Sequence, residues 1–510
     1  MERNLLGVDV GTGSVKVSVI TETGKQVGLA AIPYELTVSR EGWREADADR
    51  IWSAFVGCLR KLIIDGTDLT RVAGIGISCL CPGLAAFDKN GKVLQNPIIY
   101  SDQRSEAEAE WINATVGEER LFEITANRCM SGAMSGASML WMKRYRPELY
   151  AATRYFGHIN TLLGLRMTGN YGIDYSNASY TSLFETTGGL CWSRALCELI
   201  TIDIEKLPPL LASDEVLGGL ISRDIIDLGI PEGTPVVIGG GDTACAALAA
   251  GTVEGGDVCE SVGTTNVLTV CVDKPQFDRS FINRCHVVGG KWIYQGAMSH
   301  IGASMIWFRD TFCRDIAEEA ERTGVSSYDL LDEMSRQSKP GADGIVFLPY
   351  MMGERSPVWD SNARGVFFGM SLDSTRNDFV RSIHEAAGYG DRQLKELAEK
   401  VTGKKITSFA SMGGGAKSEI YAQIKADIIG ADIELLEMTD MASAGAALLA
   451  GIGTGIFENA AQASETLERR VLKRVNSRST NREAYERGYA VYTELYPRLK
   501  ELFGKLQQPE

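Results

Sequence analysis

The chain has 510 residues, more than one hydrophobic core usually organises, so we expect two domains. Apolar residues make up 44% and charged residues 23% of the chain, which is ordinary for a globular protein. The formal net charge of −14 argues against a nucleic-acid binder, although a local nest of backbone N–H groups can still bind a phosphate.

The chain start and the cysteines predict a cytoplasmic protein. Residues 1–10 show no cationic segment followed by a long apolar one, so we expect no signal peptide. No apolar stretch is long enough to span a bilayer, and no membrane partner is expected. The eleven cysteines form no Cys-x-x-Cys pair, which is typical of reduced thiols, and the four histidines lack zinc-site spacing.

The segment 7–20, GVDVGTGSVKVSVI, predicts a strand, a glycine turn and a second strand with period-two valines. A further turn at 23–25 predicts a third strand. A dinucleotide-binding fold needs a helix directly after such glycines, so that fold is excluded. Asp9 stands in the apolar run before the turn, where an unpaired carboxylate is costly to bury.

The next elements alternate in the manner of an α/β protein. Asp47 is expected to cap a helix with apolar residues at helical spacing, and residues 72–80 form a buried strand. Asn90-Gly91 predicts a hairpin over 87–94, and residues 235–251 read as strand, glycine turn and helix. A last helix begins near Asn481, with a capping box from Thr480 to Glu483 and a kink at Pro497.

The opening pattern recurs at half the chain length. Residues 260–272, ESVGTTNVLTVCV, repeat the strand, Gly-Thr turn and strand of the opening segment, 252 residues further on. The matched pairs are Gly11 with Gly263, Thr12 with Thr264, and Ser14 with Asn266. A supersecondary unit that recurs at half length predicts two similar domains facing each other.

Both Gly-Thr turns have the composition of a phosphate nest. Glycine lets the backbone approach a phosphate closely, and the hydroxyls of Thr12, Ser14, Thr264 and Thr265 add donors. Asp9 at the strand end would then hold Mg²⁺ directly or through water. The alternative is a turn stabilised by a local Asp hydrogen bond; two such turns at half-chain spacing favour the phosphate interpretation.

Three further segments carry candidate chemistry. Asp242, after Gly239-Gly240-Gly241, is either the N-cap of a helix or a general base that accepts a proton from an attacking hydroxyl. The glycines 413–415 either form a tight strand-to-helix turn or let an adenine lie against the backbone. The segment 351–370 reads as a loop pinned by paired charges of Glu354, Arg355, Asp360 and Arg364.

Five stretches, in this order, resemble the motifs of the FGGY carbohydrate kinases. They are GVDVGTGSVK, IGGGDTACAALAAG, ESVGTTNVL, GERSPVWDSNARGVFFGM, and MGGGAKSEIYAQIKADIIG with ASAGAALLAG. The resemblance implies an α/β actin-like ATPase (ribonuclease H-like) fold, with two similar domains around a central cleft. The domains would be residues 1–244, on the sugar side, and 245–510, on the adenosine side.

The resemblance also implies ATP and Mg²⁺ as cofactors and assigns residues to roles. Asp242 would be the base for the sugar hydroxyl, and Asp9 would lie near the metal. The nucleotide would contact Gly11, Thr12, Gly13, Ser14, Lys16, Gly263, Thr264, Gly302, Gly414, Gly415 and Ser418.

The sugar pocket departs from the family pattern. After the strand GIGIS, glycerol kinases carry an Arg-Glu pair and xylulokinases a Met-His-Gly, whereas this chain has residues 79–83, CLCPG. Tyr100, Asp102 and Thr243 are the candidates for hydroxyl contacts. The alternative for Asp102 is that it pairs with Arg104 or caps a helix.

The leading hypothesis is an ATP-dependent kinase of a small sugar or polyol, with a four- or five-carbon ketose such as xylulose as the default acceptor. Glycerol is an alternative acceptor, disfavoured by the missing Arg-Glu pair. A non-catalytic, actin-like nucleotide switch is the alternative class. The hairpin edges and the last helix are candidate surfaces for a homodimer.

Overall fold

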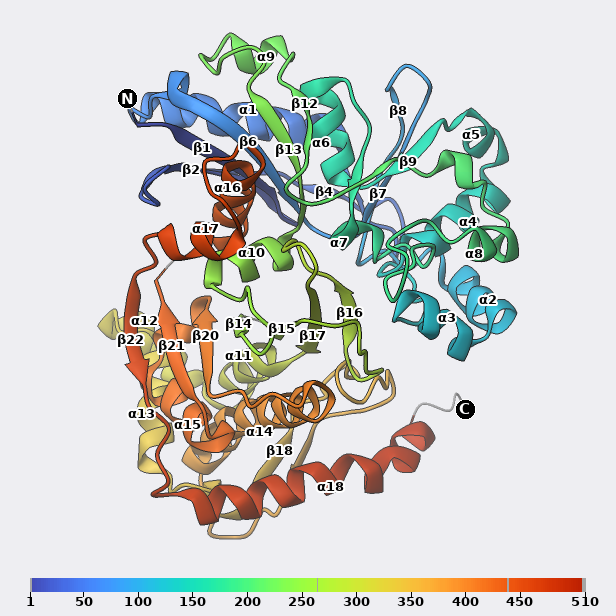
Figure 1. The fold of residues 1–510 in the computed structure, drawn as a ribbon. Helices are drawn as coiled ribbons and strands as arrows, with labels where there is room; N and C mark the ends of the chain where they lie inside the picture. Colours follow the sequence, from blue (N-terminus) through green and yellow to red (C-terminus); the bar gives the residue numbers. More distant parts are fainter. Residues whose placement is uncertain (1, 264, 438–439, 507–510) are drawn as a thin grey trace.

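Two mixed β-sheets, one in each half of the chain, form the frame of the structure (Figure 1). The computed structural model describes residues 2–263, 265–437 and 440–506. The first sheet has the spatial order β12 (Val216–Gly219), β13 (Pro235–Gly241), β6 (Val72–Cys79), β1 (Asn4–Val10), β2 (Ser14–Thr21) and β3 (Gln26–Pro33). The second has the order β16 (Ile282–Cys285), β17 (Trp292–Met298), β15 (Asn266–Val272), β14 (Val258–Val262), β20 (Ser408–Met412), β21 (Asp432–Leu436) and β22 (Val471–Val475).

The two sheets repeat one topology. In the first, β1 pairs antiparallel with β2 and parallel with β6, which pairs parallel with β13. In the second, β14 pairs antiparallel with β15 and parallel with β20, which pairs parallel with β21. β3 and β17 extend the two antiparallel sides, and β12 and β22 close the other edges. The predicted internal repeat and the actin-like fold class are confirmed.

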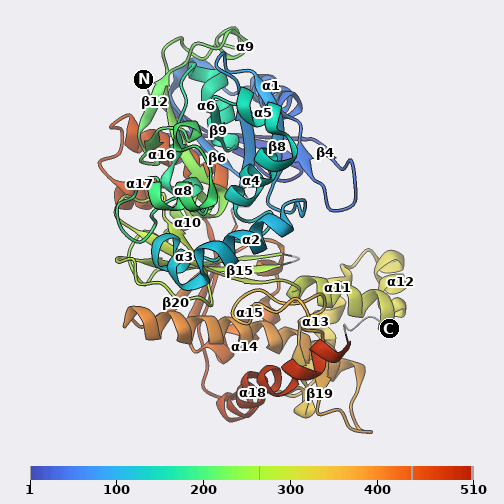
Figure 2. The same ribbon diagram turned by 90° about the vertical axis from the view of Figure 1, so that its right-hand side faces the viewer.

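The first half carries a large additional region beside its sheet (Figure 2). A small sheet there contains β4 (Leu36–Thr37), β5 (Glu45–Ala46), β8 (Val93–Ile99), β7 (Gly83–Phe87) and β9 (Tyr155–Gly157). The helices of this half are α1 (Ala48–Ile64), α2 (Glu106–Val116), α3 (Glu118–Thr125), α4 (Ser135–Tyr145), α5 (Pro147–Ala152), α6 (Ile159–Thr168), α7 (Tyr175–Ala178), α8 (Arg194–Ile200) and α9 (Arg223–Ile226). Asp47 caps α1 as predicted, accepting from the N–H groups of Asp49 and Arg50.

The second half surrounds its sheet with longer helices. They are α11 (Ile301–Phe312), α12 (Arg314–Thr323), α13 (Ser327–Gln337), α14 (Arg376–Thr402), α15 (Glu419–Ile429), α17 (Ala460–Thr466) and α18 (Arg482–Leu506). The predicted last helix is confirmed as α18, which continues through Pro497 and buries Tyr485, Tyr492 and Leu495.

In Figure 1, α10 (Asp242–Ala250) lies between the two sheets, and α16 (Met441–Gly453) lies with the first sheet although it comes late in the chain. α10 follows β13, and α16 follows β21; they pack together, and α16 lies on β1 and β6 of the first sheet. Glycine permits this close approach, because a Cβ at Gly76 would lie 1.9 Å from the carbonyl oxygen of Ala446. A helix late in the sequence therefore completes the first half. The predicted boundary at 244/245 falls inside α10 and stays a prediction.

The state of the cysteines and the search for membrane-spanning helices can be compared with the expectations from the sequence. All eleven cysteines are free, and nine of them are buried, as expected of reduced thiols. Among the described residues, no helix combines the length and apolarity needed to cross a bilayer.

Candidate active site

The carboxyl edge of the first sheet brings Asp9 and Asp242 together. Asp9 is the penultimate residue of β1, and Asp242 directly follows β13. Asp9 is buried and Asp242 is half-buried, and the charge of Asp242 acts on Asp9. Asp9 Oδ1 accepts a hydrogen bond of 2.7 Å from the Ser78 hydroxyl in β6. Two carboxylates at one sheet edge have the chemistry needed for proton transfer beside a metal ion.

The local geometry of Asp242 does not support the N-cap alternative. Gly241 is the N-cap of α10, and Asp242 is the first helical residue. Its Oδ1 accepts from the backbone N–H and the hydroxyl of Thr243, at 2.6 and 3.1 Å. The carboxylate is thus oriented by its neighbour and does not cap the helix; its role as a general base stays a prediction.

Burial controls the protonation of both carboxylates. It raises the pKa of Asp9 to about 7; the negative charge of Asp242 adds to this rise, and the Ser78 hydrogen bond and Lys16 oppose it. Burial also raises the pKa of Asp242, against the positive charge of Arg284 and the hydrogen bonds from Thr243. A base with a raised pKa is better matched to proton transfer near neutral pH.

Lys16 lies opposite Asp9 in the register of β1 and β2, on the same face of the sheet. Its Nζ forms an ion pair of 2.7 Å with Asp440, which precedes α16. The Lys16 side chain remains 35% exposed, so it can still reach a ligand. This ion pair joins the two halves at the predicted phosphate site.

The first glycine turn is ordered by its own backbone and by Tyr34. The Gly11 N–H donates to the Ser14 carbonyl at 3.0 Å, and the Tyr34 hydroxyl donates to the Gly11 carbonyl at 2.5 Å. A Cβ at Gly13 would meet no atom within 4 Å. The turn therefore presents open backbone, which fits a phosphate.

The second glycine turn is one residue shorter than the first. Val10 pairs with Val15 across the first turn, whereas Val262 pairs with Asn266 across the second. The matching of Ser14 with Asn266 is therefore wrong, because Asn266 occupies the place of Val15. Its buried amide donates to Asp391 at 2.8 Å and not into the turn. Thr264 lies outside the described residues.

The glycines 413–415 lie beside this second turn. Gly413 has φ of 99°, and a Cβ there would lie 2.5 Å from the Val262 carbonyl oxygen. Gly414 is exposed with no atom near its Cβ position, whereas a Cβ at Gly415 would lie 2.3 Å from a methyl group of Val262. The turn is therefore tight on one side and open on the other. A tight strand-to-helix turn and a surface on which adenine could lie are thus compatible interpretations of this segment.

Two other predicted nucleotide residues begin helices in the second half. The Ser418 hydroxyl caps α15 by accepting from the Tyr421 N–H at 3.1 Å. Gly302 lies in the first turn of α11, just after β17, whose last residue Met298 pairs with Asn266. Gly302 therefore lies at the same sheet edge as Gly263. No described contact joins this group of residues to Asp9 and Asp242.

Of the predicted acceptor residues, Tyr100 is the most available. It is 43% exposed, and its hydroxyl lies 3.3 Å from that of Thr12. Asp102 is fully buried and accepts four hydrogen bonds, three from Arg104 and one from the Arg44 N–H. This supports the pairing alternative for Asp102 over a hydroxyl contact. Thr243 orients Asp242, as described above.

A buried polar network behind the site was not predicted. The Ser176 hydroxyl accepts from the Gly241 N–H at 3.0 Å and donates to Asp174, which also accepts from Asn177 and Ser213. His158 joins it through Asn177 at 3.0 Å. The network fixes the backbone that carries Asp242. The sequence feature that could have indicated this network is the polar run Asp-Tyr-Ser-Asn at 174–177. Its first residue, Asp174, also caps α7.

Arg284 in β16 was also missed. Its side chain is buried beside Gly241, and its guanidinium carbon lies 5.1 Å from the Tyr180 ring. The signal was a charged residue inside a short strand, between Asn283 and Cys285.

The segment 351–370 is not pinned by paired charges. Among its described residues, Glu354, Arg355, Asp360 and Arg364 form no ion pair. Glu354 instead accepts from the backbone N–H groups of Ser299 and Arg355, both at 2.8 Å. Because Ser299 follows β17, the segment anchors the start of α11 through backbone hydrogen bonds.

The residues present fit a magnesium nucleotide in part. Asp9 offers a carboxylate at the open glycine turn, where a Cβ at Gly11 would lie 4.0 Å from Asp9 Oδ2. Among the described residues, no group of three or more His, Cys, Asp or Glu side chains forms a ready-made metal site. A metal would therefore take most of its ligands from phosphate and water, as Mg²⁺ commonly does.

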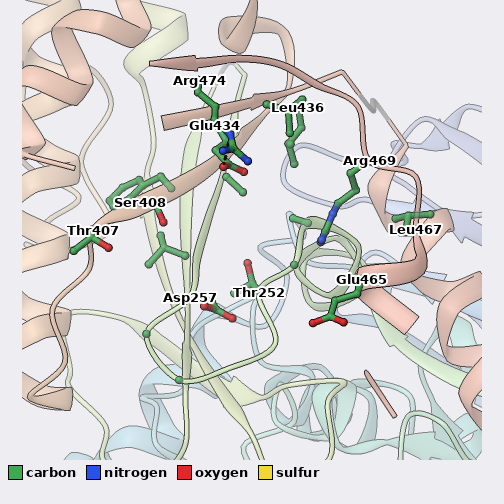
Figure 3. A pocket seen from close by; sticks show the side chains of 18 of the residues that line it. Thr252, Asp257, Thr407, Ser408, Glu434, Leu436, Glu465, Leu467, Arg469 and Arg474 are labelled. Carbon is green, nitrogen blue, oxygen red and sulfur yellow. Dashed lines mark ion pairs between the residues drawn. The ribbon is translucent and has the colours of Figure 1, made fainter. Parts of the chain in front are cut away.

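One described cavity lies away from these residues. It encloses about 620 Å³ and is lined by Thr252, Asp257, Ser408, Glu434 and Arg469 among others (Figure 3). Val258 and Ser408, which begin β14 and β20, line it, whereas Gly263 and Gly413 follow the opposite ends of those strands. None of the predicted site residues lines this cavity.

The chain is similar to known carbohydrate kinases over nearly its full length. It is 30% identical to a xylulose kinase of Bacillus subtilis, over 98% of this chain and 97% of the relative. It is 26% identical to a gluconokinase of the same organism, over 90% of this chain and 89% of that one. The solved xylulose kinase of Rhodospirillum rubrum superposes with a TM-score of 0.90 at 26% identity, covering 98% of this chain and 100% of that one.

Two family models match in tandem. The N-terminal domain of the FGGY family of carbohydrate kinases matches residues 4–249, and the C-terminal domain matches residues 259–454. The chain therefore belongs to the FGGY family of carbohydrate kinases and is a phosphotransferase.

Proposed function

We propose that the chain transfers the terminal phosphoryl group of ATP to a hydroxyl of a ketopentose such as xylulose, or of a related four- or five-carbon ketose or polyol. The observation that carries the proposal is the placement of Asp242. Its half-buried carboxylate lies at the end of β13, where its charge acts on Asp9, and Asp9 in turn lies next to an open glycine turn. The names of the relatives support a sugar acceptor, with xylulose as the default.

In this proposal each group has one task. Asp242 orients the acceptor hydroxyl and takes its proton as the hydroxyl attacks the terminal phosphorus. The backbone of Gly11, Gly13 and Gly263 and the side chain of Lys16 hold phosphate oxygens. Mg²⁺, held through Asp9 and water, would neutralise charge on the phosphates. Tyr100 lies on the acceptor side.

The proposal is tested by measuring ADP release from Mg²⁺-ATP with and without a panel of ketopentoses, tetroses, polyols, gluconate and glycerol. We expect release that depends on the acceptor, with a ketose as the best acceptor and glycerol as a poor one. Release that no acceptor stimulates would contradict the proposal and favour the nucleotide-switch alternative. Greatest stimulation by glycerol would favour the alternative acceptor. A homodimer stays a prediction, for which light scattering is the direct measurement.

A further inference from the structure

Arg284 is a buried cation at the junction of the two halves. It lies in β16, the edge strand of the second sheet, and its side chain is 1% exposed. Its Nε and Nη2 atoms have no hydrogen-bond partner, and no carboxylate oxygen lies within 4.0 Å of the guanidinium among the described residues. An unpaired buried charge is strongly unfavourable, so these free donors call for a partner.

The guanidinium lies next to the candidate base. A Cβ at Gly241 would be 2.8 Å from Arg284 Nη1, so the arginine uses the space that glycine leaves free at the residue that precedes Asp242. The Tyr180 ring covers the guanidinium at 5.1 Å. Both Gly241 and Tyr180 belong to the first half, whereas Arg284 belongs to the second. Separation of the halves would therefore expose the unpartnered atoms to a ligand.

The two unpartnered donors define the shape of that ligand. The N–H bonds of Nε and of one Nη2 hydrogen are nearly parallel on one edge of the planar guanidinium, which suits two adjacent oxygen atoms. We propose that Arg284 is a specificity residue, whose Nε–Nη2 edge donates two hydrogen bonds to neighbouring oxygen atoms of the phosphoryl acceptor. This inference rests on the proposed function and specifies how its acceptor is recognised.

Two kinds of acceptor share this chemistry. A ketose presents a carbonyl oxygen beside a hydroxyl oxygen, and a sugar acid presents the two oxygens of a carboxylate. Residues 79–83 carry neither the Arg-Glu pair nor the Met-His-Gly segment of the family. Under this proposal the guanidinium of Arg284 supplies hydrogen-bond donors from the opposite half in their place.

The test compares Arg284→Lys and Arg284→Gln with the wild-type enzyme, using ketopentoses and aldonates as acceptors. Lysine keeps the charge but has no two-donor edge, and glutamine keeps one donor nitrogen without the charge. We expect both variants to raise KM for the acceptor at least tenfold, with KM for ATP and basal ATP hydrolysis within about twofold of wild type. Arg381→Lys is the matched control, because Arg381 is also buried but its guanidinium donates to Glu385 in α14, Ser335 in α13 and Tyr485 in α18.

The outcomes separate the possibilities. If the acceptor is a carboxylate, Arg284→Gln loses more activity than Arg284→Lys; if it is a neutral ketose, the two variants lose similar amounts. An unchanged acceptor KM in a folded variant overturns the inference and leaves the proposed function intact. If the wild-type enzyme phosphorylates no acceptor, both fall.

A second measurement tests chemical rescue of a smaller variant. Arg284→Ala, refolded or purified with millimolar methylguanidinium, is expected to regain acceptor-dependent turnover as the added cation fills the vacated site. Failure of rescue in a variant that melts like wild type overturns the inference.

Discussion

The hydroxyl of Thr12 lies 3.3 Å from the hydroxyl of Tyr100. Thr12 belongs to the first glycine turn, which we assign to phosphate, and Tyr100 is a predicted contact to the acceptor. Their contact means that the predicted phosphate site and the predicted acceptor site adjoin in the first half of the chain. A phosphoryl group bound at the turn would then have little distance to travel, as direct transfer requires.

Asp242→Asn is expected to lower acceptor-dependent turnover by at least ~10²-fold, because an amide cannot accept the hydroxyl proton. Nucleotide affinity should change little, since no assigned phosphate contact involves this side chain. Steady-state kinetics with nucleotide binding by calorimetry checks both. Asp227→Asn, at an exposed position in the loop after α9, is the control and should behave like wild type. Near-normal turnover in Asp242→Asn would remove it from the role of base.

Asp9 makes the stability of the ligand-free protein depend on pH. Burial raises its pKa from the usual value near 3.8 to about 7. Between these values the folded state holds a proton that the unfolded state has released, so the free energy of unfolding falls as pH rises, by up to ~4 kcal/mol. Asp9→Asn should abolish this pH dependence. The free energy of unfolding of the variant relative to wild type should therefore be higher at pH 8 than at pH 5. Denaturant unfolding at both pH values measures it; a difference that does not vary with pH would contradict it.

The same residue gives a separate prediction for the metal. Asp9→Ala should raise the Mg²⁺ concentration needed for half-maximal turnover, because the carboxylate that we assign to the metal is lost. Turnover is measured at fixed ATP over a range of Mg²⁺. Unchanged Mg²⁺ dependence would remove Asp9 from the metal site.

Gly414→Ala separates binding from folding. A methyl group at this position meets no protein atom within 4 Å, and Gly414 is not among the residues with positive φ. We therefore expect a melting temperature close to wild type but a KM for ATP raised several-fold, since the methyl group would occupy the space assigned to the nucleotide. Gly188→Ala, equally open and exposed, is the control. An unaltered KM for ATP would argue against adenosine at this turn.

Ser176→Ala tests whether the buried network positions the base. Removing the hydroxyl leaves the Gly241 N–H without its acceptor, which costs about 1–3 kcal/mol of stability. We expect a lower kcat as well, because that backbone carries Asp242. Ser464→Ala is the comparison, since Ser464 is equally buried but donates to Leu248, away from the site. A loss of stability without a loss of kcat in Ser176→Ala would assign the network to folding alone.

The local signals in the sequence were sufficient for the framework. The period-two valines after Gly13, the N-cap at Asp47 and the hairpin at Asn90-Gly91 each depend on neighbouring residues, and each appears as predicted. The repeated Gly-Thr turn correctly predicted that the two halves contain equivalent sheets. A comparison without gaps could not reveal that the second turn is one residue shorter.

What the sequence could not reveal depends on contacts between distant residues. The partner of Gly241 is Ser176, 65 positions away, and Arg284 reaches the site from the other sheet. Asp102 and Arg104 are close in sequence, but only burial shows that their pairing uses the whole carboxylate. Asp242 was ambiguous because a cap and a base have the same residue type, and the cap position proved to be Gly241.

The placement of α16 has a consequence for biosynthesis. β1 and β6 emerge early from the ribosome, but the helix that covers them is encoded at 441–453. The apolar face of this sheet therefore stays uncovered in the nascent chain while some 360 further residues are synthesised, counted from the end of β6 at residue 79. Chaperone dependence during translation, and aggregation of truncated products that end before residue 441, follow from that order of synthesis.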